Sequence, residues 1–211
     1  MTTRIQRIPC GNGNSFLIFT EESGILVDTG REKYRQKVLD ACRNIPVRLL
    51  VLTHGHVDHV QNAAFLSEAL GVPAAIHRAD LPLLADQFSQ PLEARGLLGH
   101  VVLSASLKSF RQDLIPPFTP TIFLSEGDTL EEYGIPAKIL ALPGHTAGSI
   151  GLDVAGRDFI AGDALMNLFY PTRSMLCHDR TAMEESARRI SALGSRTIHF
   201  GHGPSVENRA W

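Results

Sequence analysis

Four side chains that commonly bind metals stand together in the segment Thr53-His54-Gly55-His56-Val57-Asp58-His59. His54 and His56 are two residues apart, so in an extended loop both side chains point the same way. Asp58 and His59 are expected at the start of the next helix, where free N–H groups and the helix dipole favour a carboxylate. By chance, three histidines and one aspartate at these offsets arise in roughly one chain in a thousand. The segment therefore predicts a metal site at a strand-to-helix turn.

Three further residues of the same kind each follow an apolar strand and a glycine. They are His145, Asp163 and His202. A glycine at such a point suits a strand that turns into a loop at a sheet edge. If the strands are neighbours, their ends meet at one edge, where functional sites are common.

The candidate ligands are His54, His56, Asp58, His59, His145, Asp163 and His202. A catalytic zinc ion takes about three protein ligands and a water molecule. The candidates are therefore too many for one ion and fit two ions if one carboxylate bridges them. Histidine and carboxylate without thiolate suit zinc, iron or manganese, and these residue types do not choose among the three metals.

The elements that must position these residues alternate between short strands and helices. Apolar runs predict strands at residues 4–8, 15–20, 24–27, 48–52, 73–77, 121–124, 137–142, 149–154, 158–161 and 197–200. Helical spacing of apolar residues predicts helices at residues 32–42, 60–70 and 183–193. The two halves look alike in outline, and two mixed sheets packed face to face with helices outside would satisfy this order.

Residues 78–120 depart from the alternation. Leu, Ala and Gln dominate to about residue 99, a further helix is expected at residues 104–112, and three prolines follow. About 40 residues make a poor core alone, so we expect a helical insertion within a single domain of residues 1–211. The apolar side chains of the insertion suit core packing, a substrate pocket or the face of a homodimer; they are Leu83, Leu84, Phe88, Leu97 and Leu98.

The composition excludes several classes of protein. Lys plus Arg number 20 and Asp plus Glu number 22, so no excess of positive charge favours nucleic-acid binding. No apolar stretch is long enough to span a membrane, and no signal-peptide pattern opens the chain. The three cysteines are far apart and form no CxxC pair, which argues against a zinc ribbon or a disulfide framework. We therefore expect a cytoplasmic protein without membrane or nucleic-acid partners.

The sequence resembles the metallo-beta-lactamase superfamily. The resemblance is carried by Val27-Asp28-Thr29-Gly30, the HxHxDH motif at residues 54–59, residues 143–149, Gly162-Asp163 and Gly201-His202-Gly203. These motifs span residues 27–203 in the order found in the family. The resemblance implies a four-layer αββα sandwich and a dinuclear metal site.

By position, the resemblance divides the candidate ligands between two metal ions. The first ion would be held by His54, His56 and His145, the second by Asp58, His59 and His202, with Asp163 as the bridge. Asp28 matches a family position that supports the metal loop from behind. Two cations about 3.5–4 Å apart can share a water and lower its pKa toward 7, giving a bridging hydroxide that attacks a carbonyl or phosphoryl centre. Asp58 would orient this nucleophile and carry a proton, as its family counterpart does.

Departures from known branches narrow the expected activity. Asp163 argues against a true beta-lactamase, which carries Cys or Ser there, and His56 argues against the diiron flavoproteins, which carry Glu. The nucleases of the superfamily carry an additional large domain or a long basic arm, and the length and net charge of this chain argue against both. Glyoxalase II resembles this site ligand for ligand, but it has a C-terminal glutathione-binding domain, whereas this chain ends at Trp211. It also commonly carries His at the position of Ser149.

We therefore expect a stand-alone, zinc-dependent hydrolase that cleaves an ester, lactone or thioester of a small molecule. The alternatives are a mononuclear iron sulfur dioxygenase acting on a glutathione persulfide-like substrate, a glyoxalase II-like thioesterase, and a non-catalytic binding module on a retained scaffold. Asn167, Tyr170 and His178 follow Asp163 in the chain and are candidate substrate contacts, with a structural role as the alternative for each.

Overall fold

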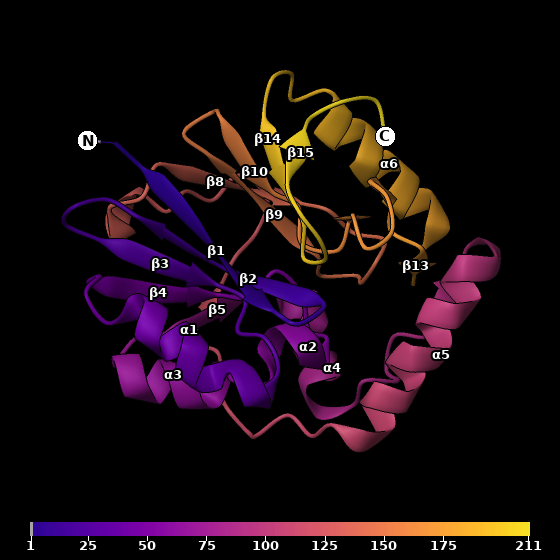
Figure 1. Cartoon of the computed structure of the whole chain (residues 1–211), viewed down its shortest axis with the longest axis horizontal. Helices are drawn as coiled ribbons and strands as arrows, with labels where there is room; N and C mark the ends of the chain where they lie inside the picture. Colours follow the sequence, from indigo (N-terminus) through magenta and orange to yellow (C-terminus); the bar gives the residue numbers. More distant parts are fainter. Residues whose placement is uncertain (1) are drawn as a thin grey trace.

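The computed structural model describes residues 2–211, which form two facing sheets with helices on the outer sides (Figure 1). The first sheet has the strand order β1-β2-β3-β4-β5-β7. Its strands are β1 (Arg4–Cys10), β2 (Gly13–Phe19), β3 (Gly24–Val27), β4 (Val47–Val51), β5 (Ala74–Ile76) and β7 (Ile122–Phe123). The strands from β1 to β3 pair antiparallel, whereas β3, β4, β5 and β7 run parallel. The parallel strands therefore end at the same edge of the sheet.

The second sheet comes from the C-terminal half of the chain and has the order β15-β14-β10-β9-β8. Its strands are β8 (Ala137–Ala141), β9 (Ile150–Val154), β10 (Asp158–Ile160), β14 (Thr197–His199) and β15 (Val206–Glu207). The strands β10 and β14 run parallel and the other pairs run antiparallel.

Alternating side chains of the central strands pack on two different layers. In β4, Leu49 and Val51 belong to the cluster between the sheets, whereas Leu50 packs toward the helices. A strand that is buried on both faces in this way is apolar at consecutive positions. The helices α1 (Arg35–Cys42) and α3 (Ala63–Leu70) cover the first sheet, and α6 (Arg180–Ser191) covers the second. The expected αββα sandwich is confirmed.

The helix expected at residues 60–70 is instead two helices, α2 (Val57–Val60) and α3. The chain breaks between them because the side-chain amide of Asn62 donates hydrogen bonds to the carbonyl groups of Thr29, Gly30 and Arg31. Residue 62 thus ties the start of α3 to the loop after β3. This loop carries Asp28 and lies beside the histidine motif.

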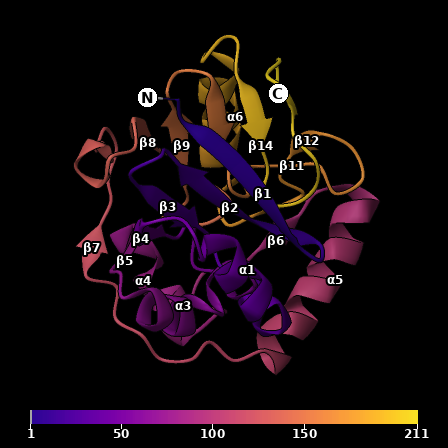
Figure 2. The ribbon, with the colours of Figure 1, turned by 60° about the vertical axis from the view of Figure 1, so that its left-hand side comes forward.

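Residues 78–120 contain α4 (Leu81–Ala85), the short strand β6 (Glu93–Ala94) and α5 (Gly96–Gln112). The prediction of a helix at 104–112 was therefore right in kind but placed its start too late. In both views α5 lies along the side of the sandwich, outside its four layers (Figures 1 and 2). Within residues 2–211, no helix combines the length and the apolar character needed to cross a lipid bilayer.

The remaining elements are short. Two-residue strands β11 (Leu165–Met166), β12 (Thr172–Arg173) and β13 (Leu176–Cys177) follow β10, and β13 pairs with β6. Single turns of 3-10 helix are η1 (Glu32–Tyr34), η2 (Arg78–Asp80) and η3 (Glu131–Tyr133). The pairing of β13 with β6 fixes the segment before α5 to the loop region after β10.

Candidate metal centre

The candidate ligands lie just beyond the C-terminal ends of four strands or on the helix that follows one of them. His54 and His56 follow β4, and Asp58 and His59 lie on α2. In the second sheet, His145 follows β8, Asp163 follows β10 and His202 follows β14. The sheets thus bring together ligands from the two halves of the chain.

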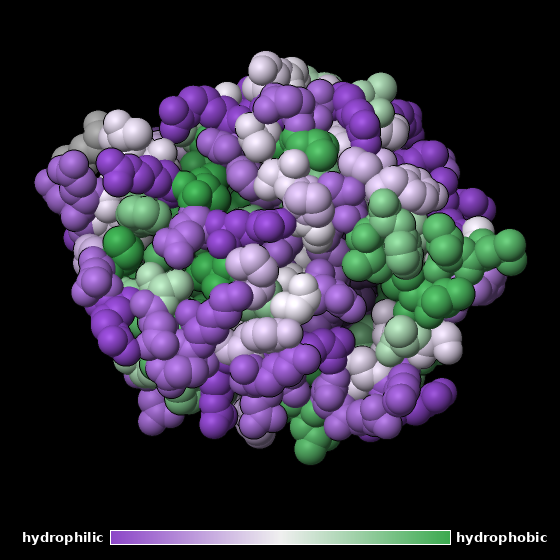
Figure 3. Space-filling model, viewed as in Figure 1, coloured by the Kyte–Doolittle hydropathy of each residue, from purple (hydrophilic) through white to green (hydrophobic). Residues whose placement is uncertain are grey.

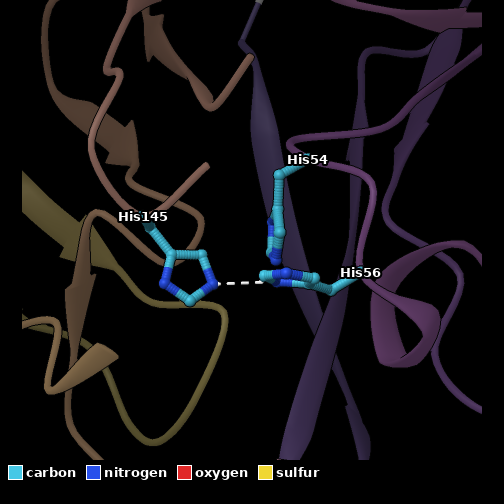
Figure 4. Close-up of side chains that lie close together, drawn as sticks. All are labelled: His54, His56 and His145. Atoms are coloured by element: carbon cyan, nitrogen blue, oxygen red, sulfur yellow. Dashed lines mark hydrogen bonds between the residues drawn. The ribbon is translucent and has the colours of Figure 1, made fainter. Parts of the chain in front are cut away.

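His54, His56 and His145 form a first cluster, shown in Figure 4. One ring nitrogen from each residue lies within 4.8 Å of the others. Nδ1 of His56 is 3.0 Å from Nε2 of His145, as the dashed line marks. All three rings are buried. Three imidazole nitrogen atoms that converge away from solvent form a donor set suited to a transition metal.

Asp58, His59 and His202 form a second cluster with the same limit of 4.8 Å between ligand atoms. Nε2 of His202 is 3.6 Å from Oδ2 of Asp58. The Asp58 side chain is 20% exposed and that of His202 is 13% exposed, so this cluster opens to solvent more than the first.

Asp163 lies between the two clusters. Its Oδ2 is 3.6 Å from Nε2 of His145 in the first cluster and 3.1 Å from Nε2 of His202 in the second. Its Oδ1 is 3.6 Å from Nε2 of His59. A single carboxylate thus reaches both sets of donors, which is the position expected of a bridging ligand.

Several polar atoms in the clusters are buried without any hydrogen-bond partner. They are Nε2 of His54, His56 and His59, and Oδ1 of Asp163. Buried polar atoms normally have partners, because an unsatisfied group loses its hydration without compensation. The unsatisfied atoms and the donor types both fit metal ions, so we infer that these residues can hold them.

Partners outside the clusters fix the orientation of the rings. Nδ1 of His59 lies 2.8 Å from Oδ2 of Asp28, and this carboxylate also accepts hydrogen bonds from the backbone and hydroxyl of Thr53. Nδ1 of His145 donates to the carbonyl of Leu176 at 2.9 Å. Nδ1 of His202 lies at the same distance from the carbonyl of Asn12. Such contacts leave the opposite ring nitrogen free to bind a metal.

Burial and the surrounding charges divide the histidines into a group with lowered pKa values and a group with raised pKa values. Burial lowers the pKa of His56 to about 3, and it also holds the pKa of His54 well below its ordinary value. Burial also lowers the pKa of His59, but the carboxylates of Asp163 and Asp28 outweigh it and raise this pKa to about 10. The first cluster therefore favours neutral rings, as metal ligands must be. At His59, protons compete with a metal ion.

The carboxylates of the site stay ionised. Burial raises the pKa of Asp58, but nearby His59, His202 and Arg31 outweigh it and lower the pKa below its ordinary value. The histidines around Asp163 likewise outweigh its burial and hold its pKa well below the ordinary range. The site therefore presents two negative charges toward cations at neutral pH.

Asp80 is a positioning residue that sequence reasoning missed. Its buried carboxylate accepts hydrogen bonds from the backbone of Gly55 at 2.8 Å, from the hydroxyl of Thr146 at 2.7 Å and from the backbone of Gly148 at 2.7 Å. Gly55 lies between His54 and His56, and Thr146 follows His145. One carboxylate thus ties together the two loops that build the first cluster.

Two buried glutamines from the same part of the chain add to this support. Gln87 accepts from the backbone of Val57 and donates to the carbonyl of Gly55. Gln90 accepts from the backbone of Ala147 and donates to Asp80. The one feature of the sequence that could have drawn attention to these residues is the presence of polar side chains in a segment rich in Leu and Ala.

The three candidate substrate contacts do not line the cavity above the clusters. The Asn167 side chain donates to the carbonyl of Pro204. His178 lies with Nδ1 3.1 Å from the carbonyl of Pro91, and Tyr170 borders a separate surface pocket beside Arg95. Met166, Leu168 and Phe169 from the same region line the cavity instead.

The cavity has a volume of about 440 Å³, which is within the range of small-molecule sites. Five of the candidate ligands line it, namely His56, Asp58, His145, Asp163 and His202. A bound small molecule would therefore touch both clusters.

The sequence model of the metallo-beta-lactamase superfamily matches residues 8–202. An uncharacterized protein of Aquifex aeolicus is 31% identical over 155 residues, which are 72% of this chain and 65% of that protein. Hydroxyacylglutathione hydrolase GloC of Haemophilus influenzae is 31% identical over 141 residues, which are 65% of this chain and 59% of GloC.

A solved structure covers nearly the whole chain. The crystal structure of TTHA1623 in a di-iron-bound form has a TM-score of 0.68 and 27% identity, covering 97% of this chain and 94% of that one. By contrast, this chain spans between half and two thirds of the length of the first curated relatives that it matches.

Proposed function

This chain belongs to the metallo-beta-lactamase superfamily, and we propose that it is a metal-dependent hydrolase that cleaves an ester, lactone or thioester bond of a small molecule. The observation that carries the proposal is the position of Asp163, whose Oδ2 lies 3.6 Å from His145 and 3.1 Å from His202. A carboxylate that reaches both clusters in this way favours a site with two metal ions rather than one. We propose zinc for both, because histidine and carboxylate ligands suit it.

A pair of divalent cations supplies Lewis-acid activation of water and of the substrate carbonyl when it is bound. The chain itself supplies the acid–base group. Asp58 lines the cavity with an ionised, partly exposed carboxylate. The oxygen of a water molecule forms a bond to the carbonyl carbon while its proton passes to Oδ2 of Asp58. As the bond to the leaving group breaks, this proton goes to the departing alkoxide or thiolate.

The likeness to GloC favours thioesters among the three bonds. GloC is named a hydroxyacylglutathione hydrolase, and it is 31% identical to this chain over 141 residues. A glyoxalase II-like thioesterase is therefore the second candidate function. The di-iron form of TTHA1623 makes iron the alternative metal to be tested.

The test measures metal content and turnover on one sample. Protein loaded with zinc, iron or manganese is assayed on a panel of thioesters, lactones, esters and phosphodiesters. We expect two metal ions per chain and hydrolysis of at least one carboxylic substrate. One iron per chain with oxygen uptake would instead identify a sulfur dioxygenase, and no turnover by any metal form would reject the hydrolase.

A variant tests the role of Asp58. Asp58→Asn should lower kcat by about 100-fold or more, because general acid–base catalysis contributes on this scale. Asp86→Asn is the matched control, since Asp86 is an exposed aspartate whose side chain accepts, among residues 2–211, a single hydrogen bond from the backbone N–H of Phe88. Because Asp58 also belongs to a cluster, metal content is measured on both variants, and full activity of Asp58→Asn would overturn the mechanism.

A further inference from the structure

The helix α5 contributes almost nothing to the hydrophobic core. It is 17 residues long, yet only Gly99 and Ser109 are buried in it. Among residues 2–211, none of its side chains belongs to the three hydrophobic clusters that hold the layers together. The apolar side chains of α5 therefore have a role other than packing the sandwich.

One face of α5 forms a wall of the cavity above the metal clusters. Val101, Val102, Ala105 and Phe110 all line this cavity. Ala105 lies four residues after Val101 and three after Val102, so these three share a helix face. Ser106, which also lines the cavity, lies four residues before Phe110 and continues the lining toward the end of the helix. The ring of Phe110 is stacked against that of His56, with 5.0 Å between the ring centroids. The apolar wall thus begins at a candidate metal ligand.

Side chains from three other segments extend the apolar wall toward solvent. Leu92 and Leu176 come from the paired segments near β6 and β13, and Met166, Leu168 and Phe169 follow Asp163. Phe169 is 54% exposed and Val101 is 63% exposed, so the apolar surface continues to the mouth of the cavity. In Figure 3 hydrophobic residues gather on the right-hand side of the molecule, over the region of α5.

Positively charged side chains also line the cavity. They are Arg31 and Lys33, which come from the loop after β3 and from η1. The Arg31 guanidinium is held by Asp113 and Ser109 of the α5 region and lies 4.0 Å from Oδ2 of Asp58. In residues 2–211, no acidic side chain forms an ion pair with Lys33. Nζ of Lys33 lies 5.0 Å from the centroid of the Tyr34 ring, a contact that does not neutralise its charge, so this charge is available to an anion.

We propose that the substrate is a carboxylic ester or thioester with one apolar arm and one anionic arm. The apolar arm lies along the cavity face of α5, and the anionic arm meets Lys33 beside Arg31. The proposal rests on the proposed hydrolase function, because the scissile carbonyl must lie at the clusters between the two arms. The cavity volume of about 440 Å³ is within the range of small-molecule sites, which favours a small molecule in this place over a protein segment.

The apolar arm is tested with a chain-length series. The substrates are S-acyl derivatives of 3-mercaptopropanoate with acetyl, butanoyl, hexanoyl and octanoyl groups, each normalised to its hydrolysis by hydroxide. We expect kcat/KM to rise by about threefold per added methylene until the cavity is filled, since each buried methylene contributes on this scale. Equal values for acetyl and octanoyl would overturn the proposal.

Two tryptophan variants show whether α5 provides the wall. Ala105→Trp places an indole in the cavity, and it should lower the ratio of octanoyl to acetyl kcat/KM by at least about tenfold. Ser104→Trp is the matched control, because Ser104 is an exposed neighbour outside the cavity lining. An unchanged ratio in Ala105→Trp, or the same fall in both variants, would contradict a role for this helix face.

The anionic arm is tested by charge removal. Lys33→Met should raise KM severalfold for the octanoyl ester of 3-mercaptopropanoate, but not for that of neutral N-acetylcysteamine. Lys138→Met, which removes an exposed lysine of β8, serves as control. In S-octyl monothiosuccinate the acyl part carries the charge and the thiol part is apolar, the reverse of the mercaptopropanoate thioesters. Comparing kcat/KM for the two arrangements shows which arm is the acyl group. Equal KM changes for charged and neutral substrates would reject the anionic arm.

A binding measurement separates this proposal from the hydrolase function. The thioether 3-(octylthio)propanoic acid has both arms but no scissile carbonyl, and 3-(methylthio)propanoic acid is its control for carboxylate binding to the metals. We expect calorimetry on the metal-loaded protein to give at least tenfold tighter binding of the octyl compound, and Ala105→Trp to remove this difference. If the octyl compound binds more tightly in this way but no ester or thioester is cleaved, the hydrolase function is rejected while the proposal of a two-armed ligand is retained. Equal binding of both thioethers would overturn the ligand proposal.

Discussion

Oδ2 of Asp28 lies 2.8 Å from Nδ1 of His59, and the two side chains are each only 1% exposed. The contact directs Nε2 of His59 toward Asp163, whose Oδ1 is 3.6 Å away. Asp28 adopts a left-handed backbone conformation with φ of 57°, which is uncommon for a residue other than glycine. Its carboxylate thus contacts Thr53, which precedes the histidine motif, and His59, which is the last residue of the motif.

Asp28→Asn should weaken metal binding by about 10-fold to 100-fold, because the amide cannot accept all of the hydrogen bonds that the carboxylate accepts. Asparagine tolerates the left-handed conformation, so the backbone should be retained. Affinity is measured by competition with a chelator. Asp158→Asn is the control, since Asp158 pairs with His199 at 3.0 Å away from the clusters. Equal loss of affinity in both variants would contradict a specific role for Asp28.

Asp80→Asn should destabilise the protein by about 1–3 kcal/mol, since it brings an amide N–H against backbone N–H donors in a buried place. The change affects Gly55 and Gly148, which belong to separate ligand loops. Urea denaturation measures the free energy of unfolding. The exposed Asp86→Asn should change it by less than about 0.5 kcal/mol. A wild-type value for Asp80→Asn would show that the loops do not depend on this carboxylate.

Gly201→Ala should abolish metal binding at the bridge. A Cβ atom at this position would lie 2.1 Å from Oδ1 of Asp163 and 2.9 Å from Cε1 of His59, so one of these ligands must move. Gly13→Ala is the control, because a Cβ there would meet atoms of the same region no closer than 3.9 Å. Metal content after dialysis distinguishes the two variants, and full occupancy in Gly201→Ala would refute the prediction.

Removal of metal by chelation should make stability depend on pH above neutrality. The carboxylates around them outweigh the burial of His59 and His202 and raise their pKa values from 6.5 to about 10 and about 9. A pKa that is higher in the folded than in the unfolded chain contributes stability that is complete below pH 6.5 and is lost as the pH rises through the folded value.

The free energy of unfolding of the chelated protein should therefore fall as the pH rises from 6.5 toward 10, which urea denaturation at each pH measures. Saturating zinc should make this fall smaller, because metal ions displace the same protons. A metal-free protein with constant stability over this range would contradict the raised pKa values.

How much of the structure can be predicted from the sequence depends on how far apart the interacting residues lie along the chain. The arrangement of two sheets follows from apolar runs such as that of β4, in which Leu49 and Leu50 pack on opposite layers. The candidate ligands could be named because the HxHxDH motif follows one such run, and His145, Asp163 and His202 each follow another within a few residues. The support from Asp80 could not be foreseen, because its partner Thr146 is 66 residues away and nothing in the local sequence links them.

The helix α5 shows a second limit of sequence reasoning. Its first turn contains Gly96 and Gly99, which have poor helix propensity, so the local pattern does not indicate a helix there. The structure begins the helix at Gly96, and the backbone N–H of the preceding Arg95 donates to the carbonyl of Met175 at 2.8 Å. A Cβ atom at Gly99 would lie 3.0 Å from the same carbonyl oxygen, so the helix start packs closely against this segment. In the same way, the hydrogen bonds of Asn62 override the apolar pattern that continues across residues 57–70.

Each cluster takes ligands from both sheets: His54 and His56 meet His145, and Asp58 and His59 meet His202. A metal ion in either place is therefore a cross-link between the two halves of the chain. During synthesis, the first half emerges with its histidines in place but without the partners that complete either set. It follows that tight metal uptake must come late in folding, after the second sheet has docked, and that the bound ions then oppose separation of the two sheets.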